Sequence, residues 1–367
     1  MFKPYNEVCK SAKYKLTGNG DRRIGMLLES FAYIDPSIDA DTYGTGKIIN
    51  DFEEELALLL GKEAAVFFPS GTMAQQIALR IWSDEKELKE VAYHPLCHLE
   101  IHEKDGLKVL HHLEPILLGS SNRLFTIEDL KSAKEPLACL LIELPQREIG
   151  GQLPTFEALV ELSEFCRDKG IKLHLDGARL FEALPYYNKS ASDICSLFDS
   201  VYVSFYKGLG GIAGAMLAGS AEFTLQSKVW KRRHGGDLIS LYPYIINAKD
   251  CMIKRMGSMN KYWQHALTVA ERLNRIEGVK TIPEVPVCNM FHAYFNTSKE
   301  MLESIFARII EKYNLVIVAS IKDIDGSSCK SELYFGDSFG LIPQELLDEA
   351  FSQFDIEYKN SKLNKRI

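Results

Sequence analysis

Three short segments of the chain combine residue types that bind or react with small molecules, and each follows an apolar run. Pro69-Ser70-Gly71-Thr72 places small residues and two hydroxyls at the expected start of a helix, where free backbone amides favour a phosphate. Asp176-Gly177-Ala178-Arg179 ends a second run with a carboxylate and a guanidinium. Lys207 ends a third run and precedes a glycine-rich loop.

Each segment taken alone also has a purely structural interpretation. Ser70 suits the N-cap of an ordinary strand-to-helix turn equally well. Asp176 and Arg179 can simply pair with each other, although two charged groups at a strand end are costly to desolvate. Lys207 can extend its amine to water, whereas a buried amine has a lowered pKa and becomes a nucleophile.

Together the three segments meet the needs of one cofactor. Pyridoxal phosphate requires a phosphate cradle, a carboxylate that keeps its pyridine nitrogen protonated, and a lysine that holds its aldehyde as a Schiff base. Gly71 and Thr72, then Asp176, then Lys207 occur in that order along the chain. The sequence therefore predicts a pyridoxal phosphate site.

Hydrophobic periodicity predicts the elements that position these residues. Six apolar runs alternate with amphipathic stretches, which indicates an α/β fold with a mostly parallel sheet covered on both faces. The runs cover residues 64–68, 91–93, 137–141, 171–175, 201–205 and 212–218. In such sheets ligands bind at the carboxyl ends of the strands, which is where the three segments lie.

Two domains and a short arm are expected along the chain. Residues 1–20 are polar and mixed and predict an N-terminal arm. Residues 21–247 carry the alternating pattern and predict a large cofactor-binding domain. Longer helical patterns and isolated strands then predict a smaller α+β domain over residues 248–367.

Composition argues against several classes of protein. The 43 basic and 50 acidic residues give a net charge of −7, so no basic field attracts nucleic acid or an anionic membrane. The apolar runs are far shorter than the roughly 20 residues of a membrane-spanning helix, and no signal-peptide core follows Met1. The eight cysteines are scattered singly rather than at zinc-site spacing. We therefore expect a cytoplasmic protein without a metal.

From about Asp41 to about Gly236 the chain resembles the threonine aldolase and β-eliminating lyase family of fold-type I pyridoxal phosphate enzymes. Several motifs in the right order carry the resemblance. They are Asp41-Thr42-Tyr43-Gly44, Pro69-Ser70-Gly71-Thr72-Met73, His98 in His98-Leu99-Glu100-Ile101-His102-Glu103, His174-Leu175-Asp176-Gly177-Ala178-Arg179, and Lys207. The resemblance implies the transferase-like fold of these enzymes, with a large cofactor domain and a smaller C-terminal domain.

This resemblance assigns roles at the cofactor. Gly71 and Thr72 would bind the phosphate, together with the neighbouring Ser70. His98 would stack on the pyridine ring, and Asp176 would hold the ring nitrogen. Lys207 would form the covalent link to the cofactor.

Further roles concern the substrate and the subunit boundary. Arg179 would take the substrate carboxylate, while Ala178 and Ser204 would complete the cofactor site. In the family, the loop that matches residues 41–47 approaches the cofactor of a neighbouring subunit. Tyr43 on this loop would therefore contact the substrate, Arg232 would reach a phosphate, and a homodimer or homotetramer with shared active sites is expected.

His98 has other interpretations. The segment also holds His94 and His102, so a satisfied loop histidine or a three-histidine metal site remains open. The pyridoxal interpretation accounts for His98 without help from its neighbours, and we therefore expect no metal.

The chain departs from the aldolase pattern at positions that bear on the substrate. The Ser-Asp-Thr segment that opens the aldolase fold is absent. Glu143-Leu144-Pro145-Gln146-Arg147-Glu148 stands where the aldolases carry Glu-Asn-Thr-His-Asn. The carboxylate-binding arginine of the family's small domain has no evident counterpart, since Lys330-Ser331-Glu332-Leu333-Tyr334-Phe335 occupies that stretch. Two interpretations of Arg147 stay open: it would substitute for the family's arginine, or it is a solvated arginine between two glutamates.

The sequence thus predicts a lyase of amino-acid metabolism that cleaves a β-hydroxy amino acid of the threonine type to glycine and an aldehyde. Lys207, Asp176 and His98 are the expected catalytic residues, with His98, or a water it orients, as the base for the β-hydroxyl. A first rival eliminates a β-substituent after Lys207 removes the α-proton, releasing pyruvate and ammonia. A second rival is a non-catalytic protein that binds the cofactor or an amino acid.

Overall fold

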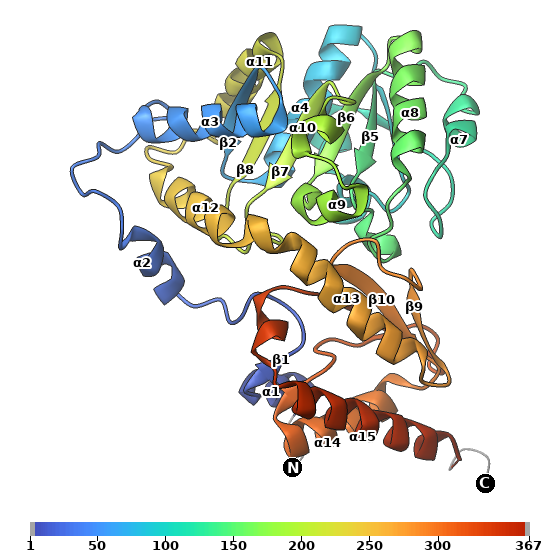
Figure 1. Cartoon of the computed structure of the whole chain (residues 1–367). Coiled ribbons are helices and arrows are strands. Elements are labelled where there is room, and N and C mark those ends of the chain that lie inside the picture. The colour runs from blue at the N-terminus through green and yellow to red at the C-terminus, as the bar shows by residue number, and fades with distance from the viewer. Residues whose placement is uncertain (1–3, 364–367) are drawn as a thin grey trace. The chain divides into compact units, whose positions relative to one another are not determined.

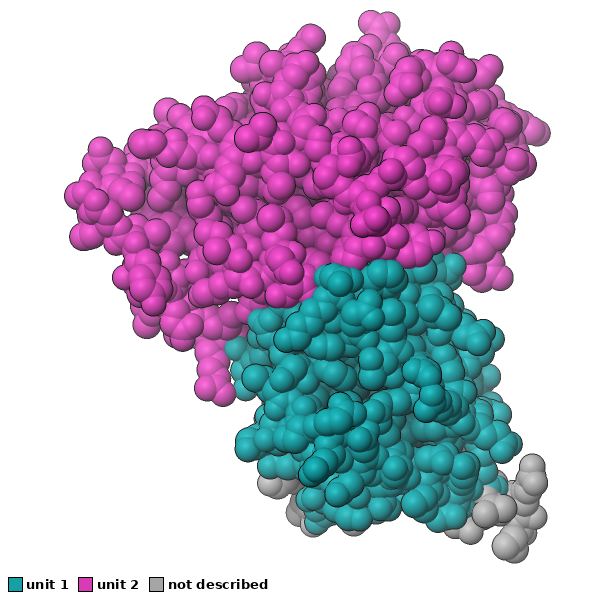
Figure 2. Space-filling model, in the orientation of Figure 1, with its two compact units in different colours: residues 1–21, 150–152, 260–367 teal, residues 22–149, 153–259 magenta. Residues whose placement is uncertain are grey.

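The computed structural model describes residues 4–363 of the chain (Figure 1). The chain divides into two compact units, coloured separately in Figure 2. Unit 1 comprises residues 1–21, 150–152 and 260–367, and unit 2 comprises residues 22–149 and 153–259. Among the described residues, no helix has the length and hydropathy that a membrane crossing requires.

Unit 2 is built on a seven-stranded sheet with the strand order β2-β8-β7-β6-β5-β3-β4. Neighbouring strands from β7 to β4 run parallel, whereas β8 is antiparallel to both of its neighbours. The predicted α/β fold with a mostly parallel sheet is therefore confirmed. The strands are β2 (Ala64–Phe68), β3 (Glu90–Tyr93), β4 (Glu114–Leu117), β5 (Cys139–Glu143), β6 (Lys172–Gly177), β7 (Ser200–Ser204) and β8 (Ala215–Gly219).

Helices lie on both sides of this sheet (Figure 1). Local sequence sets their ends: Thr155 caps α8 by accepting a hydrogen bond from the Ala158 amide, and Gly170 ends it in a left-handed conformation. The helices of unit 2 are α2 (Gly25–Phe31), α3 (Lys47–Leu60), α4 (Gly71–Lys86), α5 (His98–Ile101), α6 (Gly106–His111), α7 (Ile127–Lys131), η1 (Arg147–Ile149), α8 (Phe156–Lys169), α9 (Leu180–Tyr187), α10 (Ala191–Cys195), α11 (Ala221–Arg233), α12 (Tyr242–Arg255) and η2 (Met256–Ser258).

The core of unit 2 fixes α4 against the sheet. Ile77, Ile81 and Trp82 of this helix are buried in one cluster with Val66 of β2 and Leu141 of β5. Burying such side chains stabilises the fold by about 1.5–3 kcal/mol each. The start of α4 is therefore held firmly at the edge where the parallel strands end.

Unit 1 contains a four-stranded antiparallel sheet of order β12-β13-β10-β9 and a two-stranded parallel pair of β1 and β11. Residues 4–20, part of the expected arm, form α1 and β1 within this unit. Its elements are α1 (Tyr5–Ser11), β1 (Tyr14–Lys15), α13 (Met259–Asn274), β9 (Val279–Ile282), β10 (Met290–Phe295), α14 (Lys299–Tyr313), β11 (Leu315–Val316), β12 (Lys322–Asp323), β13 (Cys329–Tyr334), η3 (Asp337–Leu341) and α15 (Gln344–Leu363).

Candidate active site

Unit 2 gathers its chemically active residues at the carboxyl-terminal edge of its sheet. The register aligns Glu143, at the end of β5, with Asp176 on β6, and Asp176 with Tyr202 on β7. Two residues, Pro69 and Ser70, separate the end of β2 from the start of α4, which lies at the same edge. Eight of the residues predicted from the sequence line one cavity there: Gly71, Thr72, His98, Arg147, Asp176, Ala178, Arg179 and Lys207.

The other four predicted residues do not line this cavity. Ser70 is the N-cap of α4, but its side chain makes no capping hydrogen bond. The Ser204 hydroxyl accepts a hydrogen bond from the Tyr206 amide (3.3 Å). Arg232 lies over the ring of Tyr43, with 4.8 Å between the guanidinium carbon and the ring centroid. The structure therefore brings Tyr43 and Arg232 together, but not with the cavity residues.

Asp176 is a buried carboxyl group whose hydrogen-bond donors are neutral. Its residue is 1% exposed, and its two oxygens accept hydrogen bonds from Gln75 Nε2 (2.6 Å) and the Ala178 amide (3.0 Å). Within residues 4–363 no cation lies at ion-pair distance from it. Burial raises the pKa of Asp176 because a charged carboxylate is poorly solvated there. A cationic ligand group would stabilise the ionised form.

Lys207 supplies an amine to the same cavity. It follows β7 and precedes Gly208, and its Nζ lies 5.3 Å from the centroid of the Tyr206 ring. Burial lowers the pKa of Lys207, and the nearby guanidinium groups of Arg179 and Arg147 lower it further. A larger fraction of this amine is therefore neutral and nucleophilic than in an exposed lysine.

Arg179 does not form the self-contained pair with Asp176 that the sequence left open. Its Nε lies 3.7 Å from Glu182 Oε2, one turn along α9. This contact is long, and it engages one edge of the guanidinium. Arg179 thus lines the cavity with a planar fork suited to a carboxylate.

The start of α4 requires a glycine. A Cβ atom at Gly71 would lie 2.0 Å from the Tyr202 hydroxyl and 2.7 Å from the Tyr206 hydroxyl. Since Ser70 makes no capping bond, the first-turn amides of this 16-residue helix are not satisfied by its side chain. The helix end combines close access for a ligand with donors that favour an anion.

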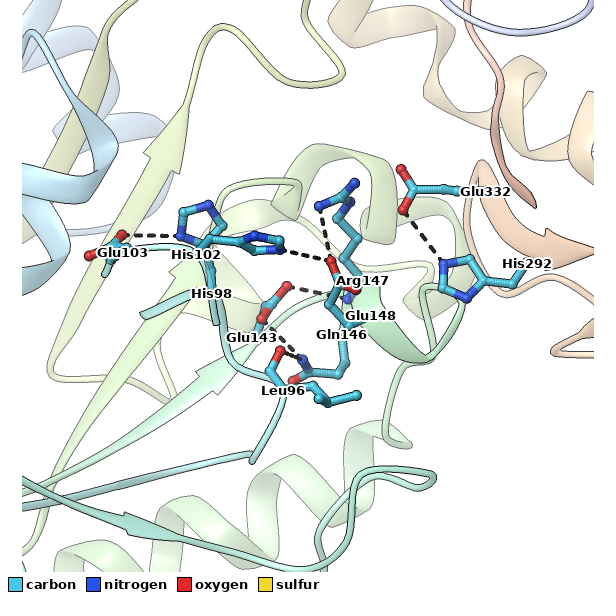
Figure 3. A network of polar contacts seen from close by, with 10 residues as sticks. All are labelled: Leu96, His98, His102, Glu103, Glu143, Gln146, Arg147, Glu148, His292 and Glu332. Atoms are coloured by element: carbon cyan, nitrogen blue, oxygen red, sulfur yellow. Dashed lines mark hydrogen bonds and ion pairs between the residues drawn. The ribbon is translucent and has the colours of Figure 1, made fainter. Parts of the chain in front are cut away.

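His98 is oriented by a buried carboxylate. Its Nδ1 lies 3.1 Å from Glu103 Oε1 (Figure 3). The other oxygen, Glu103 Oε2, accepts a hydrogen bond from Gln76 Nε2 (2.7 Å). The Glu103 side chain is almost fully buried, and its partner Gln76 belongs to α4. The chain from Gln76 through Glu103 therefore fixes the position of the His98 ring.

His94 does not join His98 and His102 in a metal site. Its Nε2 donates to the carbonyl oxygens of Ser120 (3.2 Å) and Arg123 (2.9 Å), and its Nδ1 accepts from the Leu96 amide (3.0 Å). Both ring nitrogens are thus engaged by backbone groups. The described residues contain no group of three side chains placed to hold a metal ion.

A second histidine–carboxylate pair lies beside the first. His102 Nε2 is 3.0 Å from Glu148 Oε1, and Arg147 Nη1 donates to the same oxygen (3.1 Å) (Figure 3). The rings of His98 and His102 are 5.1 Å apart and inclined by 49°. The two histidine–carboxylate pairs and Arg147 all line the cavity.

Glu143 is a further carboxyl group of the cavity. Burial, and then the neighbouring Asp176, raise the pKa of Glu143 to about 8. Its oxygens accept hydrogen bonds from Gln146 Nε2 (3.1 Å) and the Arg147 amide (3.3 Å). Near neutral pH this group is therefore largely protonated.

The raised pKa of Glu143 predicts a pH-dependent stability. The folded state binds this proton more tightly than the unfolded state, so stability falls as pH rises from the ordinary glutamate range through about 8. We expect Glu143→Gln to flatten this decline in thermal melts of cofactor-free protein at pH 6 and pH 9. The exposed Glu161→Gln on α8 should leave the decline as in the parent. Equal declines in the Glu143→Gln and Glu161→Gln proteins would contradict the assignment.

Sequence reasoning missed several residues of the cavity. Gln75, Tyr202 and Tyr206 contribute to it, yet none stands in a quoted motif, and Glu103 stands in one but was given no role. One signal was present: Gln75 and its neighbour Gln76 are two adjacent buried polar residues in a helix whose other buried positions, apart from Ser83 near its end, are not polar. Polar groups in such positions are hydrogen-bonded, which indicates a polar site beside the helix.

Comparisons with known proteins agree with this geometry. A family model described as β-eliminating lyase matches residues 32–295. Low-specificity L-threonine aldolase 1 of Arabidopsis thaliana is 25% identical over 299 residues, which cover 78% of this chain and 83% of that protein.

Two solved structures are similar over nearly their whole length. A candidate L-allo-threonine aldolase from Listeria monocytogenes EGD-E is 54% identical with a TM-score of 0.95, covering 96% of this chain and 98% of that one. A candidate aromatic amino acid β-eliminating lyase/threonine aldolase from Exiguobacterium sp. 255-15 is 50% identical with a TM-score of 0.94, covering 96% and 99%. The fold is that of the fold-type I pyridoxal phosphate enzymes, and the resemblance found in the motifs is confirmed. The chain belongs to the β-eliminating lyase family.

Proposed function

We propose that this protein is a pyridoxal phosphate-dependent carbon–carbon lyase that cleaves a β-hydroxy amino acid of the threonine type to glycine and an aldehyde. One observation carries the proposal: a buried carboxyl group with neutral donors, Asp176, shares a cavity with the lowered-pKa amine of Lys207. The names of the relatives, which refer to threonine aldolases, support the reaction.

The residues present fit the cofactor. The first turn of α4 offers amides near Gly71 and Thr72, where a side chain in place of Gly71 would collide with two tyrosines. Asp176 lacks the cationic partner that a protonated pyridine nitrogen would supply. Gln75 Oε1, beside it, is buried without a hydrogen-bond partner among residues 4–363. The first-turn amides of α4 and the Asp176 carboxyl group thus match the phosphate and the ring nitrogen of pyridoxal phosphate.

The proposed roles follow from these positions. Gly71 and Thr72 would hold the phosphate, Asp176 the ring nitrogen, His98 the ring face and Lys207 the aldehyde carbon. When bound, the cofactor supplies an electron sink for the bonding pair released at the substrate Cα. Ser70, Ala178 and Ser204 remain proposed as supporting residues of the same site. The cytoplasmic location also stays a prediction.

Arg179 is the proposed binding residue for the substrate carboxylate. We expect Arg179→Lys to raise the KM for threonine by about tenfold or more, because one ammonium cannot reproduce a two-pronged contact worth about 1.5–3 kcal/mol. Arg147→Lys is the matched variant, since Arg147 lines the cavity but already donates to Glu148. Steady-state kinetics of both variants decides between them: a larger KM effect in Arg147→Lys would move the carboxylate site to Arg147.

Product analysis tests the reaction itself. Purified protein loaded with pyridoxal phosphate and given threonine or allo-threonine should release glycine and acetaldehyde in equal amounts. Serine and tryptophan serve as substrates for the rival reaction. Pyruvate and ammonia as the main products would establish β-elimination instead, a reaction that the lowered pKa of Lys207 also permits.

A homo-oligomer with shared active sites is part of the proposal. Tyr33, Ile38 and Ile253 are 94%, 49% and 70% exposed and line one apolar groove beside α2, α3 and α12. Exposed apolar surface of this kind is typical of interfaces. The loop that holds Tyr43 is anchored to the start of α12. Asp41, two residues before Tyr43, accepts hydrogen bonds there from the amides of Leu241 and Tyr242.

Subunit exchange tests this assembly. If Tyr43 serves the partner's site, mixing inactive Lys207→Ala with inactive Tyr43→Ala should give hybrid dimers with one intact site. Random exchange then restores about a quarter of the parent activity per subunit. Light scattering and tagged subunits verify the exchange. A monomer, or verified hybrids that stay inactive, would refute shared sites.

A further inference from the structure

Two histidine–carboxylate pairs face the same cavity, and the carboxylates determine which ring nitrogen can take up a proton. An ionised carboxylate can only accept a hydrogen bond. His98 therefore donates through Nδ1 to Glu103, and His102 donates through Nε2 to Glu148. The remaining nitrogens, Nε2 of His98 and Nδ1 of His102, carry lone pairs and have no hydrogen-bond partner within residues 4–363.

One imidazole cannot do both jobs that the sequence assigns to His98. Its lone pair lies in the plane of the ring, whereas stacking presents the face of the ring to the ligand. A histidine stacked on a planar cofactor therefore directs its lone pair alongside that plane, rather than at a hydroxyl standing above it. The ring of His102 is inclined by 49° to that of His98 at a centroid distance of 5.1 Å (Figure 3).

The polar setting of His102 suits proton transfer. The Glu148 oxygen that it contacts also accepts a hydrogen bond from Arg147 Nη1, which holds the carboxylate in place. The side chain of His102 is 41% exposed, so a proton taken up there can pass to water. The charged and titratable groups placed around it are Glu148 and Arg147 on η1, His98 on α5, and Glu103.

We propose that His102 is the catalytic base for the β-hydroxyl of the substrate, that Glu148 is its positioning residue, and that His98 serves as the stacking group. This inference rests on the proposed function and deepens it by naming the proton acceptor. It differs from the sequence expectation, which gave the task to His98.

The step balances as a retro-aldol cleavage. His102 Nδ1 takes the proton of the β-hydroxyl, and the electron pair of the O–H bond forms the carbonyl of the departing aldehyde. The Cα–Cβ bond breaks, and its electron pair remains at Cα. A proton from solvent water then binds to Cα and gives glycine. His102 returns to its neutral form by losing its proton to water, so no net proton is gained or lost.

Exchange of the glycine α-proton separates the role of His102 from the rest of the machinery, because it uses the cofactor and an α-base but no β-hydroxyl. The experiment compares the holoenzymes of the parent, of His102→Ala and of a control, His112→Asn. His112 is exposed and has a left-handed backbone conformation, which asparagine tolerates. Threonine cleavage is measured by acetaldehyde release, and glycine exchange is measured by NMR in D2O.

We expect His102→Ala to lose about 10²- to 10⁴-fold in kcat for cleavage. Glycine exchange and the cofactor absorbance should stay within about threefold of the parent, and His112→Asn should match the parent in both reactions. Added imidazole should restore at least tenfold of the lost cleavage in His102→Ala, which a structural role would not allow. Glu148→Gln should lower kcat more than it raises KM.

Cleavage by His102→Ala within threefold of the parent would overturn the inference. So would a parallel loss of glycine exchange, or failure of imidazole to rescue. Failure of the proposed function would appear in the parent protein itself: a parent that exchanges the glycine proton but cleaves no β-hydroxy amino acid would overturn both proposals. Failure of the inference about His102 alone would appear only in the variant, beside a parent that cleaves normally.

Discussion

Lys207→Ala is expected to abolish turnover, with kcat reduced by about 10³-fold or more, the scale on which removal of a nucleophile acts. The reason is positional: Lys207 is the amine that lines the cavity containing Asp176, and burial lowers its pKa. The loss should appear in cleavage and in glycine exchange alike, because both reactions depend on the cofactor.

The matched control is Lys62→Ala. Burial also lowers the pKa of Lys62, but its amine donates to the Phe198 carbonyl and does not line the cavity. We expect this variant to keep the parent kcat and to lose only thermal stability. Equal losses of kcat in the two variants would show that general damage, not loss of the nucleophile, explains the effect of Lys207→Ala.

Asp176→Asn is expected to lower kcat by about 10²- to 10³-fold, the cost of removing one preorganised electrostatic group from an active site. The new amide still hydrogen-bonds but cannot stabilise a protonated ring nitrogen. Its local fit is preserved, since rotation of the Gln75 side-chain amide lets the unpartnered Oε1 accept from the new NH₂ group.

The same substitution should stabilise the protein without cofactor. The folded pKa of Asp176 lies above its unfolded value, so stability is lost as pH rises above the ordinary aspartate range. At neutral pH the folded parent is destabilised by the buried, poorly solvated carboxyl group of Asp176, and Asp176→Asn removes this destabilisation. We expect the Tm of cofactor-free protein to rise by about 2 °C or more. If Asp176→Asn kept the kcat of the parent, or if its Tm fell and part of the protein were unfolded, Asp176 would have a structural role.

The catalytic residues found from sequence are those whose position depends on local rules. Asp176 and Lys207 each follow an apolar run, and parallel strands bring their carboxyl ends to one edge. Gly71 stands at a strand-to-helix turn, which is also a local pattern. These residues could therefore be grouped before any tertiary contact was known.

Pairs formed between distant segments could not be found in this way. His102 and Glu148 are 46 residues apart, and their contact depends on how η1 packs beside α5. Glu103 is only five residues from His98, yet its orientation depends on Gln76 of another helix. Side-chain pairing of this kind requires the packed fold.

The remaining differences in fold have similar causes. β4 was not predicted, since its sequence Glu114-Pro115-Ile116-Leu117 is short, contains proline and forms the edge of the sheet. The start of the chain is polar overall, but Cys9 and Ala12 pack against Ile310 and Val316. Only contacts across more than 290 residues of sequence reveal that packing.

In the proposed enzyme, Lys207 holds pyridoxal phosphate in the cavity of unit 2. Borohydride reduction of the loaded protein, followed by protease digestion and mass spectrometry, tests it most directly. We expect a stable pyridoxyl label on the peptide that contains Lys207 and no label in Lys207→Ala. A label on another lysine, or protein that takes up no label after incubation with the cofactor, would contradict it.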